Sequence, residues 1–226
     1  MKKDSAHKPL FFLTNELYFP SVEDANSDGL LAVGGDLSPE RLLLAYKSGI
    51  FPWFNEDSLM LWWSPDPRMV LFPDRIKISK SMRKVLNSGQ FTLTRNTCFE
   101  KIIDQCALVK REGQEGTWIT EEMKMAYIKL HEIGVAKSYE VWEEGQLVGG
   151  LYGLDLGHVF CGESMFSTVS NASKFAFIKL AEELKQKKYK LIDCQLHTKH
   201  LESLGAEEIP RSEFIQFLKL EDQGGQ

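Results

Sequence analysis

Three strand-like runs followed by one amphipathic helix constrain the fold of this chain more than any other feature. The runs cover about Ala136–Trp142, Gln146–Leu154 and His158–Cys161, and turn residues separate them. Behind the third run, apolar residues recur at helical spacing up to Leu184, and Asn171 is a suitable N-cap for that helix. This stretch therefore predicts part of a sheet with a helix packed beside it.

The segments on either side extend this pattern into a longer order of strands and helices. We expect a strand over 91–95, a helix over 97–109 opened by a Thr97-x-x-Glu100 capping box, a helix from Thr120 to Gly134, a strand over 190–196, a short helix over 198–204 and a strand-like piece before Ser212. The order β-α-α-β-β-β-α-β-α-β predicts an α+β fold in which helices flank a mixed sheet.

The first 70 residues differ from the rest and predict a small N-terminal α/β domain, 1–70, ahead of a larger domain, 71–226. An apolar run, Asp28–Asp36, ends in a Gly-Gly turn. Ser38-Pro39 then supplies an N-cap and a proline at the first helical position, so we expect a helix through Lys47.

Three of the five tryptophans fall between residues 53 and 63, where prolines interrupt the chain. This pattern predicts an aromatic-rich loop rather than a helix or a regular strand. We expect Trp62 and Trp63 to be buried, because aromatic side chains dominate burial. Trp53 lies in a rigid, proline-bounded segment, which is what stacking on a nucleobase requires.

The composition is that of a globular protein. The chain has 226 residues, of which 43% are hydrophobic, and its formal net charge is -5, so it is no generic nucleic-acid binder. No apolar run reaches the roughly 18 residues that a membrane span needs. Met1–Asp4 is not followed by the apolar core of a signal peptide. We therefore expect a cytoplasmic protein without a membrane anchor.

The cysteines and histidines do not form a metal-binding pattern. The four cysteines are scattered in apolar surroundings without a C-x-x-C pair, and we expect buried thiols. His197 and His200 form an isolated pair that lacks further ligands. We expect no metal and no cofactor.

A basic run lies between residues 75 and 84. Its cations are Arg75, Lys77, Lys80, Arg83 and Lys84. Apolar residues interrupt the run at helical spacing, so the cations should face away from a buried stripe. Only one nearby acid, at position 74, is available to neutralise them. Two interpretations remain open: a solvated helix face, or a local surface that contacts phosphates.

Polar side chains occur at two places inside apolar, strand-like sequence. Asp193 and Gln195 should share one face of a strand, about 7 Å apart. Glu163 and Ser164 should lie where the preceding strand breaks off before the helix. Each group has a structural explanation, such as binding a neighbouring backbone. Their joint occurrence at two strand ends also fits a ligand site.

Seven sequence runs, in order over about residues 15 to 215, resemble those of the leucyl/phenylalanyl-tRNA-protein transferases. They are Asp28–Leu37, Gly49–Phe54, Trp63–Arg68, Gly116–Ile119, Phe160–Phe166, Asp193–Gln195 and Ser203–Ala206. The resemblance implies an acetyltransferase-like (GNAT) domain behind a small N-terminal domain. It also implies an enzyme that moves leucine or phenylalanine, with methionine as a further candidate, from Leu-tRNA or Phe-tRNA to proteins with N-terminal Arg or Lys, and so marks them for N-end-rule degradation.

The resemblance also assigns roles to individual residues. The catalytic residues would be Asp193, Gln195 and Glu163, with Ser164 helping Glu163 to position the reacting ends. Trp53 and Trp118 would hold the terminal adenosine of the tRNA. Met165, Phe166, Leu180 and Leu184 would line or support the pocket for the amino acid. The basic run from Arg75 to Lys84 would contact tRNA.

Our mechanistic hypothesis is that Asp193 orients Gln195 and helps proton transfer from the attacking amine, without a covalent enzyme intermediate. Transfer assisted by the adenosine 2′-hydroxyl is an alternative. Two other functions compete with this one. An acyl-CoA-dependent N-acetyltransferase would need a glycine-rich loop before the helix at 171, and the sequence there has none. A non-catalytic module would bind tRNA or degradation signals. We expect a monomer.

Overall fold

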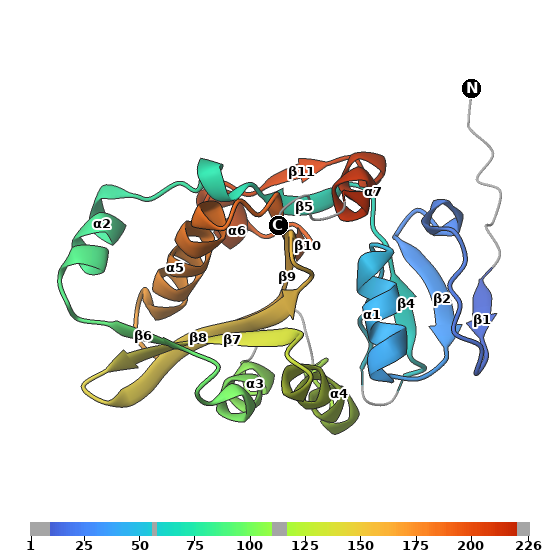
Figure 1. Cartoon of the computed structure of the whole chain (residues 1–226), viewed down its shortest axis with the longest axis horizontal. Helices are drawn as coiled ribbons and strands as arrows, with labels where there is room; N and C mark the ends of the chain where they lie inside the picture. The colour runs from blue at the N-terminus through green and yellow to red at the C-terminus, as the bar shows by residue number, and fades with distance from the viewer. Residues whose placement is uncertain (1–9, 56–57, 110–116, 221–226) are drawn as a thin grey trace, which may run out of the picture.

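Two β-sheets organise the chain (Figure 1). The computed structural model describes residues 10–55, 58–109 and 117–220. The N-terminal residues Met1–Asp4 and Gly116, the first residue of the Gly116–Ile119 run, lie outside these ranges. The smaller sheet has the strand order β1-β2-β4-β3 and the larger one the order β11-β5-β10-β9-β8-β7-β6. The predicted mixed α+β fold is confirmed. The domain boundary between residues 70 and 71 stays a prediction.

The smaller sheet contains the N-terminal strands, with helix α1 beside it. Its elements are β1 (Phe11–Leu13), β2 (Leu30–Gly34), β3 (Phe51–Pro52), β4 (Leu61–Trp63), the short helix η1 (Val22–Asp24) and α1 (Pro39–Lys47). Ser38 caps α1 as predicted, since its Oγ accepts a hydrogen bond from the backbone of Arg41. The predicted aromatic-rich loop is wrong, because part of it forms β3 and β4. Trp62 is fully buried and its indole nitrogen donates to the Gly34 carbonyl, 2.8 Å away.

The larger sheet is mixed, and helices cover both of its faces. Its strands are β5 (Arg68–Leu71), β6 (Thr92–Arg95), β7 (Ala136–Glu143), β8 (Gln146–Asp155), β9 (Val159–Ser167), β10 (Leu191–Gln195) and β11 (Glu207–Ile209). Only β9 and β10 pair in parallel; the other neighbours within this sheet are antiparallel. The helices are η2 (Pro73–Arg75), α2 (Lys80–Asn87), α3 (Phe99–Ala107), α4 (Glu121–Glu132), α5 (Ala172–Gln186), α6 (Lys199–Ser203) and α7 (Arg211–Lys219).

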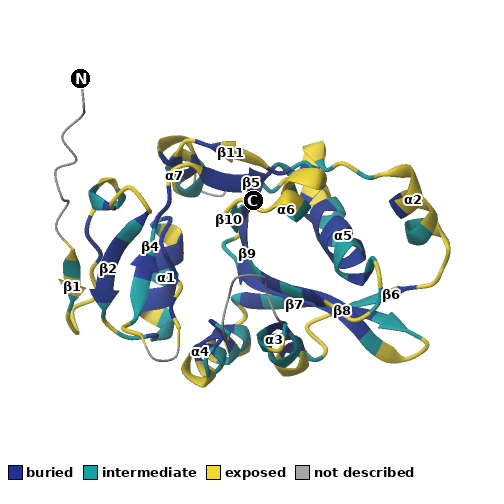
Figure 2. Ribbon diagram, turned by 180° about the vertical axis from the view of Figure 1, so that it is seen from behind, coloured by how far each residue is buried: buried dark blue, intermediate teal, exposed yellow. Residues whose placement is uncertain are grey.

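Helices α3 and α4 lie on one side of strands β7–β9 and α5 lies on the other (Figure 1). The buried hydrophobic residues, which are among those coloured dark blue in Figure 2, form two clusters. Leu151 belongs to the cluster under α5, whereas its neighbour Tyr152 belongs to the cluster shared with α3, α4 and the N-terminal segment. Successive residues of β8 thus pack on opposite faces of the sheet.

Two helix starts differ from the predictions because tertiary contacts override the local signals. The Thr97 hydroxyl donates to the buried Glu140 carboxylate, 3.0 Å away, and the helix begins at Phe99 with Cys98 as N-cap. The predicted capping box is therefore wrong. Asn171 precedes α5, but it adopts a left-handed conformation with φ of 72° and its side chain caps nothing. Thr120 and Thr198 do cap α4 and α6.

Candidate active site

A pocket of about 610 Å³ opens where strands β9 and β10 separate. The two strands pair only as far as Cys161 and Asp193. Beyond that point Gly162–Ser167 and Cys194–Leu196 both line the pocket. The N-terminal segment closes another side with Phe51–Trp53. The pocket is therefore built from the divergence of two parallel strands, with walls that are mostly apolar.

Glu163 lies in a β-bulge in the middle of β9. The register between β8 and β9 shifts here, so that Gly162 and Ser164 face consecutive residues of β8 and Glu163 is the extra residue. The prediction that the strand breaks at Glu163 is wrong, because β9 continues to Ser167. Bulges redirect a side chain and are frequent next to active sites. Here the bulge places the Glu163 side chain among the residues that line the pocket.

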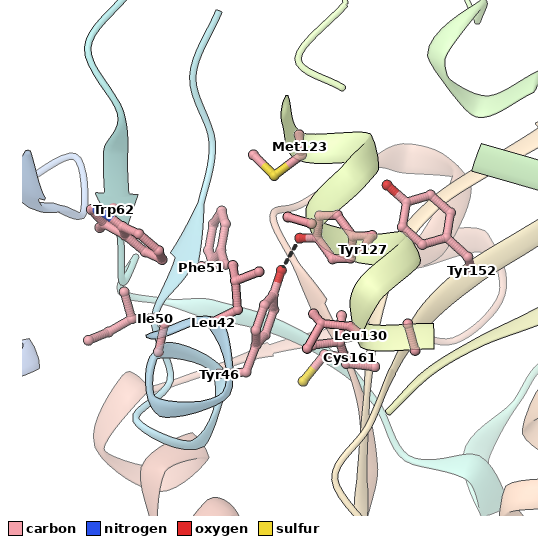
Figure 3. Close-up of a cluster of buried hydrophobic side chains, with 14 of the residues drawn as sticks. Leu42, Tyr46, Ile50, Phe51, Trp62, Met123, Tyr127, Leu130, Tyr152 and Cys161 are labelled. Carbon is pink, nitrogen blue, oxygen red and sulfur yellow. Dashed lines mark hydrogen bonds between the residues drawn. The ribbon is translucent and has the colours of Figure 1, made fainter. Parts of the chain in front are cut away.

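Two donors from different elements hold the Glu163 carboxylate. The Tyr127 hydroxyl donates to Oε2 at 2.8 Å, and the Gln195 side-chain amide donates to Oε1 at 2.8 Å. The Tyr127 hydroxyl is in turn hydrogen-bonded to that of Tyr46, as Figure 3 shows. Burial raises the pKa of Glu163 to about 8, although the hydrogen bonds from the two donors oppose that rise. Burial therefore favours the protonated form of this carboxyl group over a wider range of pH than in water.

Asp193 forms a buried ion pair with Arg68. The guanidinium donates to both carboxylate oxygens, at 2.8 and 2.7 Å, and each side chain is 1% exposed. The Arg68 guanidinium lies 4.7 Å from the ring centres of both Phe51 and Phe214. Asp193 Oδ1 also accepts the backbone N–H of Gln195 at 2.9 Å. Asp193 itself is not among the residues that line the pocket, so it reaches the pocket through Gln195.

A second bulge explains the position of Gln195. The register between β10 and β5 shifts between Asp193 and Gln195, and Gln195 has a positive φ of 63°. The simple alternation predicted for this strand is therefore wrong: Cys194 and Gln195 both line the pocket. The hydrogen bond from the Gln195 backbone to Asp193 holds this unusual conformation, and the amide side chain then reaches Glu163.

All but one of the predicted substrate-binding residues line the pocket. Those that line the pocket are Trp53, Trp118, Ser164, Met165, Phe166 and Leu180. Leu184, one turn further along α5, is buried beside the pocket and does not line it. Trp53 is 37% exposed and packs edge-to-face against Trp63 at 5.7 Å, whereas Trp118 is only 5% exposed.

Family models match most of the chain. The model described as leucyl/phenylalanyl-tRNA protein transferase matches residues 70–219, and the model for the N-terminal domain of that protein matches residues 35–66. The chain belongs to the leucyl/phenylalanyl-tRNA protein transferase family.

Curated relatives with the family name match over nearly their whole length. The leucyl/phenylalanyl-tRNA–protein transferase of Flavobacterium johnsoniae is 62% identical over 93% of this chain and 99% of its own. That of Syntrophobacter fumaroxidans is 54% identical over 93% of this chain and 90% of its own. Among solved structures, a GCN5-related N-acetyltransferase from Kribbella flavida has a TM-score of 0.37 at 9% identity, covering 78% of this chain and 63% of that one.

The basic run of this family member is exposed. Arg75, Lys77, Lys80, Arg83 and Lys84 all lie on the surface, and those on α2 face away from the buried Met82. Ser79 caps α2, because its hydroxyl oxygen accepts a hydrogen bond from the backbone N–H of Met82. Arg75 forms an ion pair with Glu207 at 2.6 Å, so the expectation that only the acid at 74 neutralises the run is wrong. Figure 2 shows α2 at the end of the molecule opposite the smaller sheet.

The described residues contain no group of three or more His, Cys, Asp or Glu side chains that could hold a metal ion. None of the helices in the described ranges is long and apolar enough to cross a bilayer. The thiol prediction is half right: Cys106 and Cys161 are buried, while Cys98 and Cys194 are partly exposed, and all four are free.

Three residues that organise the candidate site were missed as site residues by sequence reasoning. Arg68 gave only a weak signal, as a cation at the start of the apolar strand Arg68–Leu71. Tyr127 lies on the buried face of α4, but nothing in the local sequence indicates that its hydroxyl meets Glu163. Tyr46 lies 81 positions away from Tyr127, and only the tertiary fold brings them together.

Proposed function

We propose that the protein transfers leucine or phenylalanine, with methionine as a further candidate, from aminoacyl-tRNA to the N-terminal Arg or Lys of acceptor proteins. Such a transfer would mark the acceptor for degradation. Family membership supports the reaction class. The observation that carries the assignment to this site is the apolar pocket that opens beside the hydrogen-bonded Glu163 and Gln195 side chains.

The side chain of the transferred amino acid would occupy the apolar part of the pocket. Met165 and Leu180 form that wall, with Phe166 beside them and Leu184 behind it. Burying a leucyl or phenylalanyl side chain contributes about 1.5–3 kcal/mol, which suffices to select apolar donors over polar ones. Trp53 would stack on the terminal adenine, and its partial exposure at the rim of the pocket supports this role.

The orientation of the Gln195 amide suits it to guide the attacking amine. Because its nitrogen donates to Glu163, its oxygen remains available as an acceptor for an N–H of the amine. Asp193 would serve as a positioning residue, since it holds the Gln195 backbone. Glu163 would face the α-amino group of the donor in its ionised form, which can accept more bonds than the two it receives from the protein.

The reaction itself needs alignment more than activation. The amine nitrogen attacks the ester carbonyl carbon, the new C–N bond forms, and the bond to the ribose oxygen breaks. The proton lost by the amine ends on that ribose oxygen, either through the Gln195 amide or through the neighbouring 2′-hydroxyl. Holding ester and amine together contributes on the order of 7 to 11 kcal/mol, which accounts for a site without a covalent intermediate.

We also propose that the cations of the basic run contact the tRNA backbone, and that the protein is a cytoplasmic monomer. The exposure of Lys80, Arg83 and Lys84 supports the first point, because no ion pair within the described residues neutralises them. The four free cysteines support a reducing compartment.

The test of the function is a direct transfer assay. The pure protein is mixed with leucyl-tRNA and a model protein that begins with arginine, and the acceptor is weighed by mass spectrometry. We expect an acceptor heavier by one leucyl residue, with no gain after ribonuclease treatment of the tRNA. The same model protein beginning with serine is the matched control. A failure to modify the arginine-initiated acceptor, while tRNA still binds, would contradict the proposal and favour a binding module.

A further inference from the structure

We propose that Tyr46 and Tyr127 are positioning residues that fix the Glu163 carboxylate, so that the N-terminal segment helps to set the geometry of the active site. This inference rests on the role proposed above for Glu163. Both tyrosines lie outside the residues that line the pocket. They act on the reaction only through the carboxylate that they hold.

The hydrogen-bonded chain connects three elements that are far apart in sequence. Tyr46 comes from α1, Tyr127 from α4 and Glu163 from β9. Tyr46 is 1% and Tyr127 0% exposed, and their hydroxyls are hydrogen-bonded to one another. Tyr127 lies 2.8 Å from Glu163 Oε2. In Figure 3 the two rings approach from opposite helices, with their hydroxyl groups pointing toward each other.

When Glu163 is ionised, the number of protons fixes the direction of each bond. A phenol has one proton to donate. Tyr127 gives its proton to Glu163, so its oxygen must accept the proton of Tyr46. The order is therefore Tyr46 to Tyr127 to Glu163, with Gln195 donating to the other carboxylate oxygen. One donor on each oxygen fixes the plane of the carboxylate relative to the pocket.

The surroundings indicate that the hydroxyls have a purpose beyond packing. Leu42 and Ile50 on the N-terminal side, and Met123 and Leu130 around α4, belong to one hydrophobic cluster with the two rings (Figure 3). Phenylalanine at either position would fill the same apolar space without burying a polar atom. A buried hydroxyl would cost about 1–3 kcal/mol if it lacked a hydrogen-bond partner, and both of these hydroxyls have one. Burial raises the pKa of both tyrosines, so they remain protonated donors across the physiological range.

The test compares Tyr127→Phe and Tyr46→Phe with the matched control Tyr139→Phe in the transfer assay. Tyr139 is also buried and also donates to a carboxylate, that of Glu183 at 3.2 Å, but it lies outside the pocket. We expect Tyr127→Phe to lower kcat by about ten- to hundred-fold, as small displacements of an aligned site do. Tyr46→Phe should lower kcat less, and Tyr139→Phe should leave it unchanged.

The pH profile separates positioning from mere folding. The bond from Tyr127 lowers the pKa of Glu163, so Tyr127→Phe should shift the acid limb of kcat/KM to higher pH. A purely structural hydroxyl would not move that limb. The Tyr46 hydroxyl also lowers the pKa of Glu163, so Tyr46→Phe should shift the acid limb in the same direction while the Tyr127–Glu163 hydrogen bond stays in place. This variant keeps the test available if Tyr127→Phe fails to fold.

Glu163→Gln distinguishes the failure of this inference from the failure of the proposed function. If Glu163→Gln keeps wild-type turnover, the role proposed for Glu163 is wrong and the inference loses its basis. If Glu163→Gln loses turnover while both tyrosine variants keep wild-type kcat and an unshifted acid limb, only the inference is overturned. Loss of turnover in all three, with Tyr139→Phe unaffected, supports both.

Discussion

The buried pair between Arg68 and Asp193 should be the most sensitive ionic interaction in the described structure. Both side chains are 1% exposed and share two hydrogen bonds of 2.8 and 2.7 Å. Asp193→Asn removes the negative charge and leaves the guanidinium buried without a counter-ion. Breaking a buried pair in this way destabilises a protein by about 3–5 kcal/mol. At about 2–4 °C per kcal/mol for a chain of this size, Tm should fall by about 6–20 °C.

A double-mutant cycle with thermal unfolding measures the pair directly. Arg68→Met combined with Asp193→Asn removes both charges, so the double variant should be more stable than either single variant. The matched control is the exposed pair of Arg75 and Glu207, with side chains 60% and 47% exposed. Removing Arg75 should change stability by no more than about 1 kcal/mol. If Asp193→Asn destabilised the protein no more than Arg75→Met, the reasoning would be refuted.

The same variant also tests the role proposed for Asp193 in the reaction. At a temperature where Asp193→Asn remains folded, turnover with saturating leucyl-tRNA should still fall, because an unpaired Arg68 disturbs the strand end that carries Gln195. Near-wild-type turnover would contradict a positioning role for Asp193 and would leave Gln195 and the tRNA 2′-hydroxyl to guide the proton.

Three further predictions concern the acid, the basic run and the pocket wall. The pKa of Glu163 is raised from 4.5 to about 8, so between these pH values the folded state retains a proton that the unfolded chain releases. The free energy of unfolding should therefore decline as the pH rises from 4.5 to about 8. Glu163→Gln should flatten that decline in denaturant titrations at pH 5 and pH 8.5; an unchanged slope would contradict the assignment. Replacing Lys80, Arg83 and Lys84 by Gln should weaken tRNA binding. The slope of the logarithm of the binding constant against the logarithm of the salt concentration should become smaller by about 0.7–0.9 for each phosphate that the variant no longer neutralises. An unchanged slope would mean that these residues do not contact the tRNA backbone. Leu180→Trp should fill part of the apolar pocket and lower kcat/KM for phenylalanyl-tRNA more than for leucyl-tRNA in competition assays. Equal reductions for the two tRNAs would mean that the side chain of the transferred amino acid does not lie against position 180.

Local signals in the sequence predicted elements that depend on neighbours in the chain. Ser38 and Thr120 cap their helices as expected, because capping needs only a hydroxyl and the next turn of backbone. Thr97 failed because a buried carboxylate, Glu140, competes for its hydroxyl from a strand about 40 positions later. Tertiary hydrogen bonds of this kind leave no trace in a local pattern.

The sequence indicated several residues that line the candidate pocket, but it did not indicate how they are positioned. Glu163 and Gln195 were expected at strand ends or on a regular strand, yet bulges position both of them. A bulge inserts one residue and reverses the period-2 pattern beyond it, so alternation cannot locate such a side chain. The counter-ion of Asp193 comes from Arg68, 125 positions earlier, and only pairing of β10 with β5 makes them neighbours.

The central claim is that the esterified amino acid lies in the pocket between β9 and β10 with its carbonyl beside Gln195. A crystal structure with a non-hydrolysable leucyl-adenosine amide tests it most directly. We predict the leucyl side chain against Met165 and Leu180, the adenine on Trp53, and the carbonyl carbon next to the Gln195 amide. An analogue bound with its side chain outside this pocket, or with its carbonyl remote from Gln195, would contradict the claim.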